Sequence, residues 1–262
     1  MTTYEPGALA ALGMYPFVPL IGAWDRLYAT VASTMVGAPT TLRWDLDPRD
    51  TWLSPQLVVG QTCGWPLVTS LRDRVRPIGA FVHIVDGTPS HIYRSVIVSH
   101  RDTTLEDLWG SRAAINSVDS LSGNISLLAS LPGAHPHWPG EIVWTGAHVA
   151  SIEAVRTHGA DVASIDGQTW AFLQRDAPNL TEGLVVIGRG PRVPHLPLVL
   201  PGGASDESVA DWRSAFAQAV RSASVSDALD TLMIEGFVAL DLSDYDELLG
   251  PLVATQPVEP PH

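Results

Sequence analysis

Short apolar strands alternate with helical segments along most of this chain, and that alternation limits its fold more than any other feature. An alternating order of strands and helices is typical of the α/β class, in which the strands form a mostly parallel sheet. We therefore expect strands at 9–14, 41–44, 57–59, 76–85, 91–98, 113–115, 142–144, 162–165, 184–187 and 196–200. The expected helices are 20–35, 64–71, 105–109, 125–131, 148–157, one from 169, and then 207–221, 227–235 and 245–249 in an all-helical C-terminal part.

One junction in this series, Ala113–Asn124, carries the strongest functional signal. A short apolar strand runs into a cluster of small hydroxyl residues, then Gly123, then a segment with apolar residues at helical spacing. A helix that begins this way has free backbone N–H groups and a partial positive charge at its first turn. The segment therefore predicts an oxyanion site, although Ser120 could equally serve as an ordinary N-cap.

Three further junctions place polar residues where a strand gives way to a helix. Gln61 to Trp65 follows one strand, Thr145 to His148 follows another, and Asp166 follows a third. Open α/β sheets bind ligands at the carboxyl ends of their strands, so these residues predict a binding cleft. Asp166 could also simply cap the helix that follows it, and capping and ligand binding are compatible.

Composition excludes several classes of function. The 262 residues can bury a large core, and no apolar run is long enough to span a membrane. The net charge of −13 disfavours nucleic acid and anionic membranes as partners. All 15 basic residues are arginine, which removes lysine chemistry, and the single cysteine, Cys63, excludes a disulfide framework. The N-terminus shows no signal peptide, so we expect a cytoplasmic protein, or a periplasmic one if a leader has been removed.

Four sequence blocks in order resemble one known family. They are Tyr93–Val98, the Ser-x-Ser-Gly segment within 113–123, Thr145–His148, and 159–166. In this respect the chain resembles the substrate-binding proteins of phosphate, phosphite and phosphonate ABC transporters, which have the type II periplasmic-binding fold. The similarity extends from about Leu9 to about Leu200.

The resemblance implies a role for each matching residue. Ser120, Ser122 and the N–H groups of Ser122 and Gly123 would hold the oxyanion of the ligand, and His148 would donate a further hydrogen bond. Asp166 stands where relatives that bind an amino-phosphonate place a carboxylate for the ammonium group. Three residues would line the same cleft: Tyr15, Gln61 and Tyr93. Leu121 departs from the family pattern, because a hydroxyl residue is common at that position.

We therefore expect two lobes, one made of residues 1–90 and 190–262 and the other of 91–189, with a ligand cleft between them. The expected function is the binding of a small anionic or zwitterionic phosphonate-like or phosphate-like solute, without catalysis, metal or cofactor. An ABC permease or a signalling protein would be the partner.

The main alternative is a cytoplasmic enzyme of the same fold, acting on a small metabolite of the thiamine-precursor or menaquinone-pathway type. A ligand sensor is a third possibility. In the enzyme, Cys63 or His148 would be the reactive group and Asp166 a base. Cys63 is otherwise an ordinary buried side chain. The pair His135 and His137 could hold a metal, but it lacks a third ligand nearby.

Overall fold

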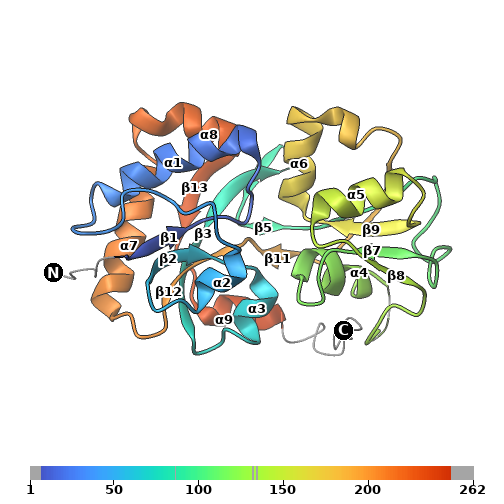
Figure 1. Cartoon of the computed structure of the whole chain (residues 1–262), viewed down its shortest axis with the longest axis horizontal. Coiled ribbons are helices and arrows are strands. Elements are labelled where there is room, and N and C mark those ends of the chain that lie inside the picture. Colours follow the sequence, from blue (N-terminus) through green and yellow to red (C-terminus); the bar gives the residue numbers. More distant parts are fainter. Residues whose placement is uncertain (1–6, 86, 132, 134, 249–262) are drawn as a thin grey trace. The chain divides into compact units, whose positions relative to one another are not determined.

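A computed structural model describes residues 7–85, 87–131, 133 and 135–248 of the chain (Figure 1). These residues form two compact units. Those up to Ile92 and from Pro194 to Asp246 make unit 1, and those from Tyr93 to Val193, with residues 247 and 248, make unit 2. The chain passes from unit 1 to unit 2 within β5 (Ile92–Tyr93) and returns to unit 1 within β11 (Val193–Pro194). These two short strands pair with each other.

Unit 1 is built on a mixed sheet with strand order β1-β2-β12-β3-β13. Its strands are β1 (Leu9–Ala11), β2 (Leu57–Gln61), β3 (Val75–Val85), β12 (Pro197–Pro201) and β13 (Ile234–Val238), and β4 (Thr88–Ser90) pairs with β3. Only the β1–β2 pair is parallel; β12 runs antiparallel to both β2 and β3. The expected α/β class is confirmed, but the expected predominance of parallel pairing is wrong for this sheet.

The helices of unit 1 pack by burying apolar faces. Helix α1 (Val18–Ala32) buries Leu20, Trp24 and Leu27, and it lies beside α7 (Asp206–Ala219) and α8 (Ser226–Leu232) (Figure 1). The remaining helices are short: α2 (Pro48–Trp52), α3 (Gly64–Val68), η3 (Ala223–Val225), α9 (Leu242–Tyr245) and η4 (Asp246–Leu248).

Strand β13 corrects the expectation that the C-terminal part is entirely helical. Helix α8 ends at Met233, which adopts a left-handed conformation with φ of 55°, and the chain then pairs antiparallel with β3. Gly79 makes this pairing possible. Its φ is +152°, and a Cβ there would collide with the Val238 carbonyl and the Phe237 ring. The helix expected to reach residue 235 therefore ends earlier, and the following residues form a strand because they pair with β3.

Unit 2 holds a second mixed sheet with strand order β10-β6-β9-β7-β8. The strands are β6 (Val96–Ser99), β7 (Ala113–Ile115), β8 (Ile142–Trp144), β9 (Val162–Ile165) and β10 (Val185–Arg189). β7 runs parallel to both β8 and β9, whereas β6 is antiparallel to β9 and β10. Two of the four pairs are thus parallel, and β7, β8 and β9 end toward the same edge.

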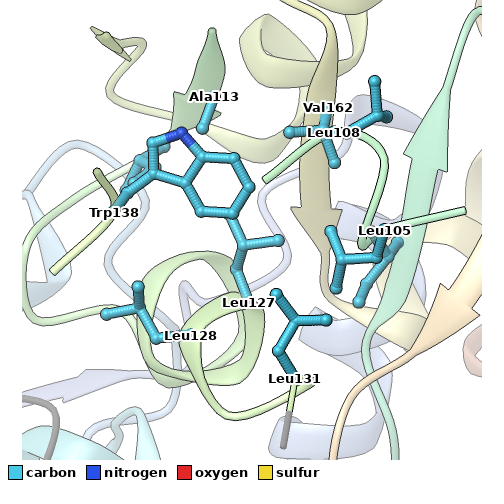
Figure 2. Packing of buried hydrophobic residues seen from close by; sticks show 10 residues of the cluster. Leu105, Leu108, Ala113, Leu127, Leu128, Leu131, Trp138 and Val162 are labelled. Carbon is cyan, nitrogen blue, oxygen red and sulfur yellow. The ribbon is translucent and has the colours of Figure 1, made fainter. Parts of the chain in front are cut away.

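Five short helical elements accompany this second sheet in unit 2. They are η1 (Leu121–Ile125), α4 (Ser126–Leu128), α5 (His148–Arg156), α6 (Gly167–Asp176) and η2 (Pro178–Leu180). Leu127 and Leu128 pack with Trp138 against Ala113 of β7, as Figure 2 shows. Leu105 and Leu108 complete the same cluster in a series of turns, where a short helix at 105–109 was expected.

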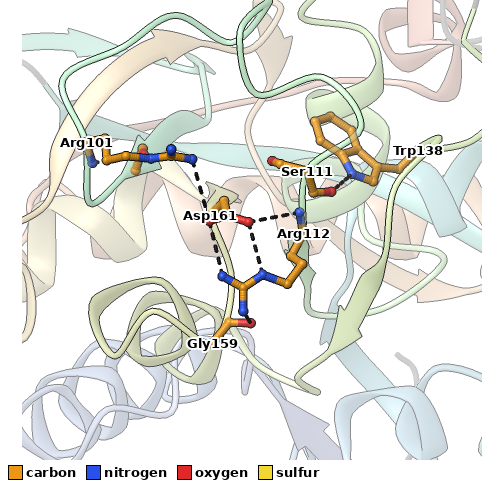
Figure 3. A network of polar contacts seen from close by, with 7 residues as sticks. Arg101, Ser111, Arg112, Trp138, Gly159 and Asp161 are labelled. Atoms are coloured by element: carbon orange, nitrogen blue, oxygen red, sulfur yellow. Dashed lines mark hydrogen bonds and ion pairs between the residues drawn. The ribbon is translucent and has the colours of Figure 1, made fainter.

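A polar network fixes the strand starts of β7 and β9, at the edge away from the ends that lead into η1 and α6 (Figure 3). Arg112 donates from Nε and from its backbone N–H to Asp161, each at 3.1 Å, and Arg101 approaches the same carboxylate at 3.6 Å. Burial favours the neutral acid, yet hydrogen bonds and charge from Arg112 outweigh it and lower the pKa of Asp161. The Trp138 indole donates to the Ser111 carbonyl at 2.7 Å.

Two other expected strands differ from those in the structure. The segment 41–44 forms a single bridge, between Ala10 and Leu42, instead of a strand, and the strand expected at 91–98 is divided into β5 and β6. The expected N-terminal and C-terminal features at residues 1–5 and from 249 onward lie outside the described residues. Among the residues that are described, no helix has the length and apolar character needed to cross a bilayer.

Candidate functional site

The hydroxyl-rich segment after β7 forms a tight, capped turn in unit 2. Ser120 adopts an extended conformation and its Oγ accepts the Gly123 N–H at 3.0 Å. The backbone N–H groups of Asn124 and Ile125 both donate to the Ser120 carbonyl at 3.1 Å, which gives the wide π-helical turn η1. Ser120 and Ser122 are 7% and 5% exposed, so any group they bind is largely removed from water. The predicted Ser cap is present, and it leaves the Ser120 O–H able to donate.

His148 joins this turn from the start of α5. Its Nε2 lies 2.9 Å from Ser122 Oγ, while its buried Nδ1 has no hydrogen-bond partner. Burial lowers the pKa of His148, and the nearby Asp166 charge opposes that shift. The ring is therefore neutral at neutral pH. If Nε2 carries the proton and donates to Ser122, the Ser122 hydroxyl can donate to a ligand.

Asp166 lies close enough to His148 for its charge to act on the imidazole, and Tyr93 lies near Gly167. Asp166 Oδ1 accepts the Thr169 N–H at 2.8 Å and so caps α6, as one sequence interpretation expected. A Cβ on the next residue, Gly167, would collide with the Arg94 carbonyl and come within 3.7 Å of the Tyr93 ring. Ser164, two residues earlier on β9, donates to the Ser122 carbonyl at 2.6 Å. Unit 2 thus contains six of the predicted residues: Tyr93, Ser120, Ser122, Gly123, His148 and Asp166.

Tyr15 and Gln61, the other two predicted residues, belong to unit 1. Tyr15 follows β1 and Gln61 ends β2, so both lie at the same edge of the sheet, and each is 1% exposed. The Gln61 carbonyl accepts the Trp52 indole N–H at 2.9 Å, but both polar atoms of its side-chain amide are buried without a hydrogen bond. A buried amide of this kind is costly unless a ligand or water completes it.

Two buried histidines surround Tyr15. The rings of His83 and His195 stack with centroids 4.2 Å apart, and each makes a tilted or edge contact with Tyr15. Burial lowers the pKa of His83 to about 3, and burial together with the neighbouring histidines lowers the pKa of His195 well below its usual value. Tyr245 Oη donates to the His195 carbonyl at 3.0 Å, which ties α9 to this cluster. The sequence analysis assigned no role to His83 or His195.

Two more polar residues were missed in unit 2. Asn116 follows β7, and its buried amide oxygen, which has no hydrogen-bond partner, lies against Gly123. Gln168, in the first turn of α6, is fully buried with neither amide atom hydrogen-bonded. Both lie at strand-to-helix junctions that the sequence analysis identified. Their position at these junctions could have marked them as candidate ligand-binding residues.

The remaining candidates form no second site. Cys63 is buried at the start of α3 in unit 1. The ring of His135 contacts Trp109, with centroids 4.5 Å apart. Among the described residues, no group of three or more histidine, cysteine or acidic side chains could hold a metal ion.

Solved structures with the same fold span nearly all of this chain. A binding-protein component of an ABC phosphonate transporter from Pseudomonas aeruginosa matches with a TM-score of 0.73 and 17% identity, covering 92% of this chain and 84% of that one. PhnD1 from Prochlorococcus marinus, in complex with methylphosphonate, matches with a TM-score of 0.73 and 16% identity over 94% and 97%. An ancestral arginine-binding protein shares the fold at a TM-score of 0.58 and 13% identity, over 87% and 99%. No curated protein sequence matches significantly.

The fold is therefore that of the two-lobed periplasmic solute-binding proteins, as the sequence predicted. The family model for the periplasmic substrate-binding protein of phosphonate ABC transporters matches residues 59–245, most of the chain. The chain belongs to that family. Family membership confirms the predicted function of a transport-type solute-binding protein.

Proposed function

We propose that this protein binds a small solute bearing a phosphonate-like oxyanion, and that the turn at Ser120–Gly123 holds that oxyanion together with His148. The observation that carries the proposal is the part-buried hydrogen bond between Ser122, in the first turn of η1, and His148, at the start of α5. Hydroxyl groups and backbone N–H groups at a helix start complement an anion without needing a cation.

Asp166 and Tyr93 of unit 2 would contact the rest of the ligand, and Tyr15 and Gln61 of unit 1 are further candidates for ligand contact. The orphaned Gln61 amide supports the proposal, because a ligand would supply its missing hydrogen bonds. A carboxylate such as Asp166 favours a ligand with an ammonium or hydroxyl group beside the oxyanion over bare phosphate.

The same family membership supports a transport role. We propose that the liganded protein delivers its solute to an ABC permease and that it works in the periplasm, the location in the family description. The cytoplasmic location expected from the first residues gains no support from the comparisons. Fractionation of cells that express the full natural gene product distinguishes the two locations.

The ligand itself can be identified by native mass spectrometry of the purified protein. We expect a co-purified phosphoryl compound, and tighter binding of an aminoalkylphosphonate than of inorganic phosphate by calorimetry. The Cys63→Ala variant should bind equally well and return its ligand chemically intact after long incubation. A modified product whose formation depends on Cys63 or His148 would instead favour the enzyme. A co-purified ligand without any oxyanion would contradict the proposal.

A further inference from the structure

Asn116 lies against the turn at Ser120–Gly123 but takes no part in the hydrogen bonds of that turn. It directly follows β7, at the edge where β7, β8 and β9 end. Its amide oxygen is buried without a hydrogen-bond partner. A Cβ added to Gly123 would collide with that oxygen and come within 3.1 Å of Ser120 Oγ. The Asn116 amide and the Ser120 hydroxyl therefore lie on the same side of Gly123.

The nitrogen of the same amide is free to donate. It forms no hydrogen bond within the described residues, and unlike the oxygen it is not buried. An amide carries its oxygen and its nitrogen on opposite sides of one carbon, so contact of the oxygen with Gly123 turns the nitrogen away from the backbone of the turn. Two N–H bonds thus lie near the Ser120 hydroxyl without a protein acceptor among the described residues.

The turn does not need the Asn116 side chain for its own structure. Ser120 Oγ accepts the Gly123 N–H at 3.0 Å, and the Asn124 side chain donates to the Val118 carbonyl at 2.8 Å. These bonds close the turn from within, whereas the Asn116 amide contributes none. A buried oxygen without a partner costs stability, so its presence beside the candidate site favours a role in ligand binding.

We propose that Asn116 is a further ligand-binding residue, whose amide nitrogen donates to the oxyanion held by Ser120–Gly123 and His148. This inference rests on the proposed function and adds a donor to that site. Contact of the amide oxygen with Gly123 sets the direction of the nitrogen, and glycine at this position leaves room for the amide. A neutral N–H donor suits an oxyanion, because a hydrogen bond to a charged acceptor is stronger than one between neutral groups.

The Asn116→Ala variant tests the donor, with methylphosphonate and inorganic phosphate as probes. We expect it to bind each probe about tenfold or more weakly in calorimetric titrations, because a hydrogen bond to a charged group is lost. In urea denaturation without ligand, the variant should be as stable as the wild type or more stable, since it removes a buried oxygen that has no partner. A side chain that only supports the fold would give the opposite result, a loss of stability.

The Asn116→Asp variant tests the sign of the contact. Aspartate has the shape of asparagine but brings a negative charge, so at neutral pH this variant should bind both probes more weakly than Asn116→Ala does. Its affinity relative to that of the wild type should recover as the pH falls toward about 4, where an aspartate gains a proton. Asn179→Asp is the matched control, because Asn179 is exposed in η2, beyond the C-terminal end of α6. It adds the same charge to unit 2 and should bind as the wild type does.

Several results would overturn the inference. Wild-type affinity for both probes in Asn116→Ala means that the amide does not reach the oxyanion. A lower free energy of unfolding of this variant without ligand means that Asn116 supports the fold. Equal affinities of Asn116→Ala and Asn116→Asp at every pH mean that the ligand's charge is not felt at this position. If the wild type itself binds neither probe, the proposed function fails, whereas failure of this inference alone leaves wild-type binding intact.

Discussion

At the scale of single residues, buried polar groups without a hydrogen-bond partner indicate a ligand site more clearly than polar groups that are already hydrogen-bonded. Ser120 and Asp166 cap helices, and a cap alone would explain both. The Gln61 amide has no such structural explanation, since both its polar atoms are buried without a hydrogen bond. Buried amides in folded proteins are normally satisfied, so this residue points to a missing ligand or water.

The first prediction concerns the hydroxyls of the anion site. Ser122→Ala should weaken binding of the co-purified ligand by about 1.5–3 kcal/mol, because a hydrogen bond to a charged group is lost. Ser120→Ala should have an effect of the same size. Calorimetry with the purified ligand provides the measurement.

Ser205→Ala is the matched control for Ser120→Ala. Ser205 caps α7 in unit 1 by accepting the Ser208 N–H at 3.1 Å, in the same way as Ser120 caps η1. Both variants should lose about 1 kcal/mol of stability, whereas only Ser120→Ala should lose affinity. Unchanged affinity in both Ser120→Ala and Ser122→Ala would remove this turn from the site.

At the scale of elements, the pairing of β3 with β13 depends on one glycine. Position 79 brings the two strands together because no side chain separates Gly79 from Val238 and Phe237. The sequence around Ile234–Val238 follows a helix directly, so its strand character becomes visible only through its partner. The expected helix at 227–235 is correct up to Leu232 and wrong for its last three residues for this reason.

The second prediction tests that contact. Gly79→Ala should lower the free energy of unfolding by about 1–3 kcal/mol, since the new methyl group overpacks the strand pair and the backbone conformation disfavours alanine. Gly203→Ala is a suitable control, because nothing lies within 4 Å of a Cβ there. Urea denaturation measures both, and equal stability of the two variants would contradict the argument.

At the scale of the whole molecule, the two units differ in how they respond to pH. Unit 1 buries the stacked pair His83 and His195 in neutral form, with the pKa of His83 at about 3. Unit 2 instead depends on the Arg112–Asp161 network, which requires an ionised carboxylate. Acid therefore destabilises unit 1 through this histidine pair.

The third prediction follows from the histidine pair. In the unfolded chain these histidines take up protons below about pH 6.5, whereas the folded protein resists protonation. Their contribution to stability is thus complete above that pH and declines as the pH falls toward about 3. The slope should be about 1.4 kcal/mol per pH unit for each buried histidine.

The His83→Gln variant checks this prediction by urea denaturation at several pH values. Glutamine keeps a polar side chain but does not titrate, so the stability of the variant should depend less steeply on pH below 6.5 than that of the wild type. An identical slope in both proteins would show that His83 does not contribute. His137→Gln controls for the loss of a histidine outside this pair.

The fourth prediction concerns the two units together. Addition of the co-purified ligand should decrease the radius of gyration in small-angle X-ray scattering, because hinge closure is a common response of two-unit binding proteins. Ser122→Ala should need more ligand to show the same decrease. An unchanged scattering profile at saturating ligand would argue for a site confined to unit 2.

The sequence by itself was sufficient for the class of fold, the family and the strand-to-helix junctions that carry the candidate site. Strands β8 and β9 were predicted at their observed bounds, because short apolar runs bounded by polar and turn residues are local signals. The Ser120 cap and the Asp166 cap were predicted for the same reason, since a cap depends on residues within one turn.

Tertiary structure decided what no local pattern encodes. Antiparallel insertion of β12 between β2 and β3 joins segments far apart in the chain, so the mixed pairing of the sheet was not predictable from strand order alone. The neutral state of His148 and the stacking of His83 on His195 arise from burial by distant elements. Whether a polar group is satisfied also depends on such neighbours, which is why the orphaned amides of Gln61 and Gln168 became visible only in the folded chain.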